Sequence, residues 1–130
     1  MNQNLFQIAL VVKDYDEAID FYIKKLGFIL IEDTILNENK RWVVVKPKGE
    51  GSCAILLAKA NTPEQEKSIG NQTGGRVFLF LHTDNIERDY QNLKDNHITI
   101  IREPAKEMYG TVLVFADLYG NFWDLIEKNN

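Results

Sequence analysis

The amino-acid sequence follows one plan twice, and this internal repeat limits the possible folds more than any single motif does. Residues 6–12 predict a strand, and Asp14 then opens an amphipathic helix that runs toward Gly27. Residues 77–81 predict a second strand of the same kind, after which Asp84 opens a second helix. The two passes are offset by about seventy residues, and two copies are too few to stack as a solenoid. We therefore expect a duplicated module that closes on its twin.

Three further strands follow the helix in each pass. They are short runs rich in branched and aromatic side chains, at 28–31, 42–45 and 53–57 in the first pass and at 98–101, 111–115 and 122–126 in the second. The sequence therefore predicts an α+β fold made of two strand–helix–three-strand modules. Within one domain of residues 1–130, the first module spans about 5–58 and the second about 76–127.

A polar, glycine-bearing segment at about 59–75 connects the two modules. Thr62 followed by Pro63 has the form of a helix start, with a capping hydroxyl and a proline at the first helical position, so we expect a short helix that ends near Gly70. Two interpretations stay open. The segment is either a plain linker or a lid over a binding cavity, in which case Gln72 and Arg76 flank its hinge.

Composition restricts the possible partners and the compartment. The chain is 45% apolar and 26% charged, carries a net charge of −4, and has neither a lysine and arginine cluster nor a long apolar run. We therefore expect no nucleic acid partner and no membrane association. The start of the chain lacks the pattern of a signal peptide, and Cys53 is the single cysteine, which favours a cytoplasmic location. We expect Cys53 to be buried and inert.

Several segments together resemble the vicinal oxygen chelate superfamily, which includes glyoxalases, bleomycin-resistance proteins and extradiol dioxygenases. The resemblance rests on the repeated plan, on Asp14, Phe21-Tyr22 and Leu26-Gly27-Phe28, and above all on the ending at 115–121 with its Asp-x-x-Gly-Asn turn, followed by Asp124. It covers nearly the whole chain. It implies two βαβββ modules that form an open, cup-shaped mixed sheet with the helices outside. In the metalloenzymes of the superfamily, a divalent ion sits at the bottom of the cup.

The chain departs from those metalloenzymes at the places of the metal ligands. The resemblance puts these places at Gln7 and at Phe78, or Val77 if the register differs by one, and in the last strands at Asp124 and at Ile55 or an apolar neighbour. Only Gln7 and Asp124 carry donor atoms, whereas such sites commonly use three or more protein ligands. We therefore expect no metal and no other cofactor.

Asp124 is the strongest candidate for a binding residue. It lies in a strand that is otherwise apolar, so burial should raise the pKa of its carboxyl group. Together with Gln7 it would anchor a polar group of the ligand, and Arg76 is the nearest plausible cation. The alternative is that Asp124 binds backbone groups at the seam between the modules.

Aromatic residues and one histidine complete the candidate site. Strand alternation places His82 on the same face as Phe78 and Phe80, where it could bind a ligand or transfer a proton, although it could equally be an ordinary residue at the end of a strand. The other candidates are Phe122 on the same wall and Trp42, Tyr109 and Tyr119 at its edge. His97 is expected to be a solvated turn residue. This mixture is typical of small-molecule sites and of hydrophobic cores alike.

Two function classes follow from these observations. The first is a metal-independent protein that binds or sequesters a small amphipathic or aromatic molecule, as the resemblance to bleomycin-resistance proteins implies. The second is a lyase, isomerase or dioxygenase of the superfamily that uses a divalent metal, or uses Asp124, His82 or Glu103 as acid and base. The missing ligands favour the first class. A homodimer is expected from the resemblance alone.

Overall fold

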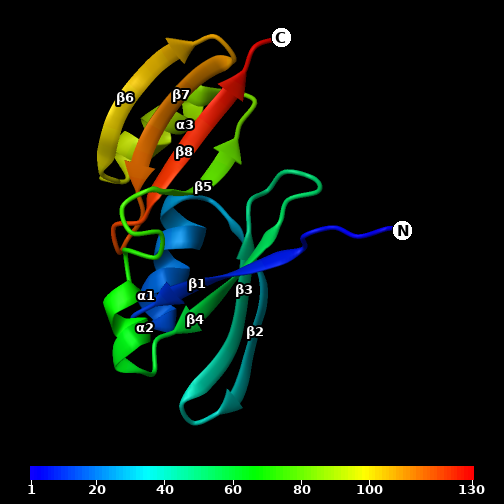
Figure 1. Cartoon of the computed structure of the whole chain (residues 1–130), viewed down its shortest axis with the longest axis vertical. Coiled ribbons are helices and arrows are strands. Elements are labelled where there is room, and N and C mark those ends of the chain that lie inside the picture. Colours follow the sequence, from blue (N-terminus) through cyan, green and yellow to red (C-terminus); the bar gives the residue numbers. More distant parts are fainter. The chain divides into compact units, whose positions relative to one another are not determined.

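The computed structural model describes all 130 residues, which divide into two compact units, Met1–Ile69 and Gly70–Asn130. Each unit contains one four-stranded mixed sheet that stays open, and a helix follows the first strand in both (Figure 1). The predicted α+β fold with two βαβββ modules is confirmed. The repeat in the sequence is therefore a repeat of one supersecondary unit.

The first unit has the sheet order β1-β4-β3-β2. β1 is parallel to β4, and the other neighbouring pairs are antiparallel. Its elements are β1 (Gln7–Val12), α1 (Tyr15–Ile19), the π-helical segment η1 (Asp20–Lys25), β2 (Ile29–Asn37), β3 (Lys40–Lys46), β4 (Ala54–Lys59) and α2 (Pro63–Ser68).

Local signals set the helix starts of this unit as predicted. The carboxylate of Asp14 accepts a hydrogen bond from the backbone N–H of Glu17 at 2.9 Å, which caps α1. Thr62 caps α2 in the same way through Gln65, with Pro63 at the first helical position. The first helix continues as η1 and ends before Gly27, which has a φ of +78° that suits glycine.

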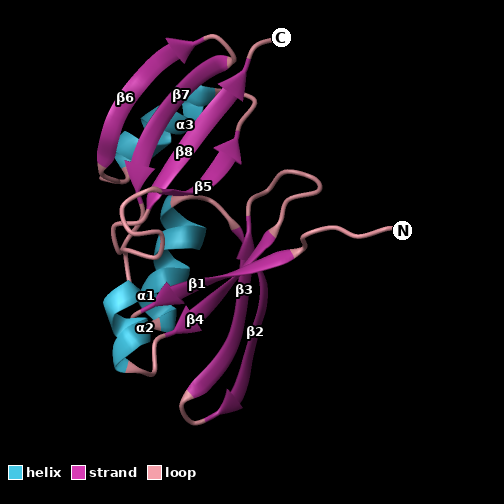
Figure 2. Cartoon of the chain, viewed as in Figure 1, coloured by secondary structure: helices cyan, strands magenta, loops and turns pink.

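The core of the first unit lies between the sheet and α1, which packs against β3 and β4 (Figure 2). The strand residues on this side are fully buried and include Leu10, Val43, Val45 and Leu57. Strand alternation places Gln7, Ala9, Val11, Trp42, Val44 and Leu56 on the face opposite α1. Because the side-chain period is two, the pairing register fixes both faces at once.

Arg41 joins the hairpin of β2 and β3 to α1. Its guanidinium donates hydrogen bonds to Asp33 at 2.7 and 3.1 Å and to Asp16 at 2.8 Å, and its backbone N–H donates to the hydroxyl of Tyr15 at 3.2 Å. The Arg41 side chain is 23% exposed. This fork geometry fixes the start of β3 relative to the helix.

The second unit has the sheet order β5-β8-β7-β6, the same arrangement as in the first. Here β5 is parallel to β8, and the remaining pairs are antiparallel. Its elements are β5 (Val77–His82), α3 (Ile86–Asp95), β6 (Ile100–Glu107), β7 (Gly110–Ala116) and β8 (Phe122–Lys128). α3 packs behind the sheet against β6 and β8 (Figure 1).

The predicted start of this second helix was one residue too early. Asn85, not Asp84, is the capping residue, and its side chain accepts from the backbone N–H of Arg88 at 3.0 Å. Asp84 instead pairs with the Arg88 guanidinium at 2.8 Å. Either side chain type can cap a helix, so the sequence alone did not separate the two.

None of the helices has the length and apolar character that a membrane span requires.

Candidate functional site

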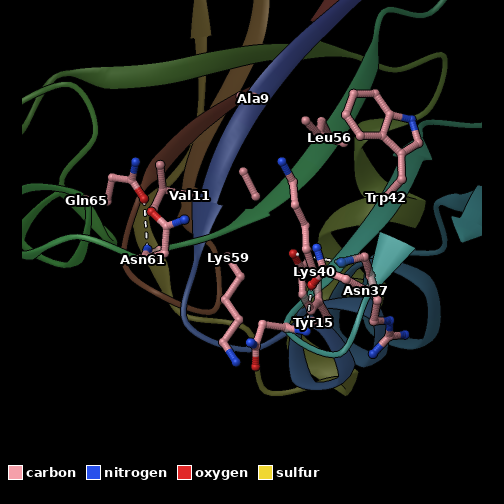
Figure 3. Close-up of a pocket in the computed structure, with 14 residues that line it drawn as sticks. Ala9, Val11, Tyr15, Asn37, Lys40, Trp42, Leu56, Lys59, Asn61 and Gln65 are labelled. Carbon is pink, nitrogen blue, oxygen red and sulfur yellow. Dashed lines mark hydrogen bonds between the residues drawn. The ribbon is translucent and has the colours of Figure 1, made fainter. Parts of the chain in front are cut away.

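A cavity of about 780 Å³ lies on the face of the first sheet opposite α1 (Figure 3). Its apolar wall comes from three adjacent strands, and its members are Ala9, Val11, Trp42, Leu56 and Ala58. Pairing of Ala9 with Leu56 and of Val11 with Ala58 brings small side chains together, which leaves room above the sheet. The volume falls in the range of sites that hold drug-sized molecules.

Polar groups surround this apolar wall at one end of the sheet. They come from the start of α1, from the β2–β3 hairpin, from the end of β4 and the loop after it, and from α2, and they are Tyr15, Asn37, Asn39, Lys40, Arg41, Lys59, Asn61 and Gln65. The Gln65 side chain accepts from the Asn61 backbone N–H at 2.8 Å, so α2 is tied to the edge of the cavity (Figure 3). An apolar wall with a few placed polar groups is the usual composition of a small-molecule site.

Most predicted site residues lie in the second unit, on the face of its sheet opposite α3. Phe80, Asp124, Val114 and Arg102 are paired in turn across the four strands and form one row on this face. His82 and Phe122 lie on the same face, since His82 pairs with Ile126 and Phe122 is two residues from Asp124. Phe80 is 68% exposed.

The environment of Asp124 agrees with the prediction for its pKa. Desolvation by burial raises the pKa of its carboxyl group, and the charge of Arg102 partly opposes that increase. The sequence suggested Arg76 as the nearest cation to Asp124. The strand register instead places Arg102 in the row of Asp124, whereas Arg76 precedes β5 and is exposed. The structure shows no hydrogen bond from the Asp124 carboxylate to backbone groups, and Arg102 acts on it through its charge from across β7.

The alternation expected for Phe78 is interrupted in the structure. Val77 pairs with Phe122 and Leu79 with Trp123, so β5 carries one residue more than β8 between these pairs. Phe78 is that extra residue. A bulge of this kind re-aims a side chain, and sequence alternation alone cannot place Phe78 relative to Phe80.

The remaining candidates lie away from that row. Tyr109 is 56% exposed at the β6–β7 turn, and Tyr119 lies in the turn before β8. Glu103 accepts a hydrogen bond from the hydroxyl of Tyr90 on α3, so it lies on the other side of the sheet from Asp124. His97 is an exposed turn residue with a φ of 57°, as predicted.

The expectation that Cys53 is buried was wrong, and part of the cavity was missed. Cys53 is only partly buried, because it precedes β4 at the end of a turn. Among the cavity residues, only Trp42 was singled out from the sequence. Strand alternation along residues 40–44 could have placed Lys40 and Trp42 on one face. The cavity residues at the end of β4 and on α2 could not be found in this way, because only long-range contacts bring them to Lys40 and Trp42.

The metalloenzymes of the superfamily that the sequence resembles bind a divalent ion. Whether this chain could bind one depends on the donor atoms that each unit offers. In the first unit Gln7 pairs with Ala54, while Ile55 faces the helix and is 3% exposed. In the second unit Asp124 is opposite Phe80, which offers no donor. No group of three histidine, cysteine, aspartate or glutamate side chains that could hold a metal ion is present.

Sequence comparison identifies relatives over the whole chain. The sequence model of one family, described as the glyoxalase/bleomycin resistance protein/dioxygenase superfamily, matches residues 4–125. An uncharacterised protein of Shewanella frigidimarina is 57% identical over 131 aligned residues, which cover 100% of this chain and 97% of that protein.

Solved structures show the same fold. The crystal structure of UcmS2 has a TM-score of 0.84 at 30% identity and covers 97% of this chain and 98% of that chain. The crystal structure of TnmS3, described as an antibiotic binding protein from a Streptomyces species, has a TM-score of 0.79 at 25% identity and covers 98% of each chain.

Proposed function

This chain belongs to the glyoxalase/bleomycin resistance protein/dioxygenase superfamily, and we propose that within it the protein acts without a metal, as a binding protein for a small amphipathic or aromatic molecule. The observation that carries the proposal is the cavity of about 780 Å³ on the first sheet, with Trp42 and Leu56 in its wall. Binding and sequestration need shape and an apolar surface but no reacting group. The similarity to TnmS3, itself described as an antibiotic binding protein, supports the same class.

The binding function is tested by a thermal-shift screen of flat aromatic compounds, thiol conjugates and antibiotics. A ligand that binds only the folded protein stabilises it by RT ln(1 + L/Kd), where L is the free ligand concentration, so the melting temperature rises with that concentration. The variant Trp42→Ala should lose most of that increase, since the indole forms part of the apolar wall. Trp42 lies at the cavity and Trp123 is 2% exposed in the other unit, so quenching of Trp42 fluorescence gives a second readout. A screen in which Trp42→Ala responds like the natural protein would exclude this cavity.

Metal independence has its own test. The purified protein should contain nickel, zinc, iron and manganese well below one equivalent, and adding these ions should leave the melting temperature unchanged, because Gln7 and Asp124 supply too few donors. Elemental analysis together with calorimetry measures both. One equivalent of a tightly bound ion would reassign the protein to the metalloenzymes of the superfamily.

A second candidate function is acid–base catalysis on the second sheet. It is favoured by the raised pKa of Asp124, which is caused first by desolvation, and by His82 on the same face of the neighbouring strand. The thiol conjugates of the screen described above are the probes for turnover. Turnover that Asp124→Asn abolishes would establish this candidate, and absence of turnover at high protein concentration would leave the binding function.

We further propose that the protein works as a cytoplasmic homodimer. The edge strand β2 is exposed along its whole length and carries Ile29, Leu30, Ile31, Ile35 and Leu36. Unpaired strand edges with apolar side chains favour association with another chain. Light scattering at micromolar concentration should give about twice the chain mass of 15.0 kDa, and a mass of one chain would contradict the dimer.

A further inference from the structure

On the basis of the binding function proposed above, we propose that the ligand of the first-unit cavity is an anion: a flat aromatic acid whose carboxylate pairs with the ammonium group of Lys40 while its ring lies against Trp42 and Leu56. The argument starts from charge. Three cationic side chains and no carboxylate line the cavity, although the whole chain has 19 acidic residues against 15 basic ones.

The three cations differ in whether a carboxylate of the protein already pairs with their charge. Arg41 is held by two carboxylates, those of Asp33 and Asp16, at 2.7 and 2.8 Å. Lys40 and Lys59 form no ion pair. Their charge is therefore available to a ligand, whereas that of Arg41 is already compensated.

Lys40 and Lys59 also differ in direction. Lys40 lies two residues before Trp42 on β3, so strand alternation puts both side chains on the face opposite α1. Figure 3 shows the Lys40 side chain extending toward the apolar wall near Leu56, while Lys59 points away from Trp42. Lys59 follows Ala58 on β4 and so belongs to the other face. Lys40 is thus the cation that a molecule lying on the apolar wall would meet.

The only acid placed on the same face by the strand register is Glu32. It pairs with Val44 in the row of Ala9 and Leu56, accepts a hydrogen bond from the Thr34 hydroxyl at 2.9 Å, and does not line the cavity. An uncompensated ammonium group beside apolar surface attracts an anion more strongly than it would in open water. A cationic aromatic compound would meet repulsion instead, so the arrangement selects by charge as well as by shape.

The test uses the full chain labelled with ¹⁵N at tryptophan and two probes of equal shape, 2-naphthoate and the neutral 2-naphthamide. The indole N–H signal of Trp42 reports binding, and that of buried Trp123, which donates to Asp117 at 3.1 Å, is the internal reference. We expect 2-naphthoate to bind about two- to fivefold more tightly at low salt, as for a partly exposed ion pair. The ratio should approach one at about 0.5 M salt.

Variants separate the charge of Lys40 from the general field of the cavity. Lys40→Gln should bring the two affinities together with 2-naphthamide binding unchanged, Lys40→Arg should keep the preference, and the matched variant Lys59→Gln should keep it as well. Equal affinities in the natural protein, or a preference that survives Lys40→Gln, would overturn the anion proposal and leave the binding function standing. If neither probe shifts the Trp42 signal at millimolar concentration, the binding function at this cavity fails, and the anion proposal with it.

Discussion

The carboxylate of Asp117 accepts a hydrogen bond from the indole Nε1 of Trp123 at 3.1 Å, and both residues are buried. The same carboxylate accepts from the backbone N–H groups of Tyr119, Gly120 and Asn121 at 3.0 to 3.1 Å and from the Asn121 side chain at 3.1 Å. The Asp-x-x-Gly-Asn motif, the most specific element of the resemblance, therefore has a structural role. It holds the turn that leads into β8, the strand that carries Asp124.

Asp117→Ala should lower the free energy of unfolding by about 3 kcal/mol or more, because several buried donors lose their acceptor together. Asp117→Asn should lower the free energy of unfolding by less, because its remaining oxygen still accepts from the backbone N–H groups of the turn. Its amide NH2 would face the Asn121 and Trp123 donors and lose those two hydrogen bonds. Urea denaturation measures both. The control is Asp84→Ala, whose side chain is 84% exposed and should change stability by less than about 1 kcal/mol. Equal effects of Asp84→Ala and Asp117→Ala would remove the motif from the folding determinants.

Gly70 should tolerate no side chain, because a Cβ atom there would lie 1.8 Å from the carbonyl oxygen of Tyr119. Gly74 is a matched control, since its φ of +68° is close to the +74° of Gly70 but open space surrounds it. Gly74→Ala should cost about 1 kcal/mol for the backbone conformation alone. Gly70→Ala should cost at least about 2 kcal/mol more, as measured by thermal unfolding, and similar costs would show that the close contact with Tyr119 is easily relieved.

Stability should depend on pH through Asp124. Because the pKa of this carboxyl group is raised in the folded state, the folded chain retains a proton that the unfolded chain has already released between the two pKa values. Stability therefore falls as the pH rises through that window, and the ionised carboxylate is unfavourable at neutral pH. Asp124→Asn should be at least as stable as the natural protein at pH 7, with a smaller advantage near pH 3.5. Urea midpoints across this range that move in parallel for both proteins would contradict the prediction.

The ion pair of Asp33 and Arg41 should make stability depend on pH in the direction opposite to that of Asp124. The hydrogen bonds and charge of Arg41 lower the pKa of Asp33, so the contribution to stability is present above the ordinary pKa of an aspartate and is lost as the pH falls below it. Arg41→Gln should cost about 1 to 3 kcal/mol at pH 7 and less at pH 3.

Arg88 provides the control for that measurement. It also pairs with two carboxylates, those of Asp84 and Asp89, but its side chain is 58% exposed against 23% for Arg41. Arg88→Gln should therefore cost less than about 1 kcal/mol. A larger cost for Arg88→Gln than for Arg41→Gln would show that burial does not decide the strength of these contacts.

Elements whose signals lie within a few residues could be predicted well. Asp14 and Thr62 are helix caps because their side chains reach backbone N–H groups three residues ahead, and both were identified. Choosing Asp84 in place of Asn85 shows the limit of this logic, since neighbouring residues of equal capping ability differ only in the path of the chain before the helix.

The candidate site was predicted less completely, because it depends on pairing between distant strands. The bulge at Phe78 is a property of β5 together with β8, and Arg102 lies in the row of Asp124 only because β6, β7 and β8 align in one particular register. The cavity beside Trp42 likewise needs β1, β3, β4 and α2 to meet. None of these relationships leaves a pattern within a single strand.

The sequence by itself determined the duplicated module, the order of its strands and helices, and the apolar setting that raises the pKa of Asp124, because periodicity, capping and local polarity act over short stretches of chain. Only the tertiary structure decided that Lys40 shares a cavity with Leu56 and that the carboxylate of Asp117 accepts hydrogen bonds from both the turn before β8 and the indole of Trp123. The physical reason is that a shift of one residue in strand register moves every side chain of that strand to the other face.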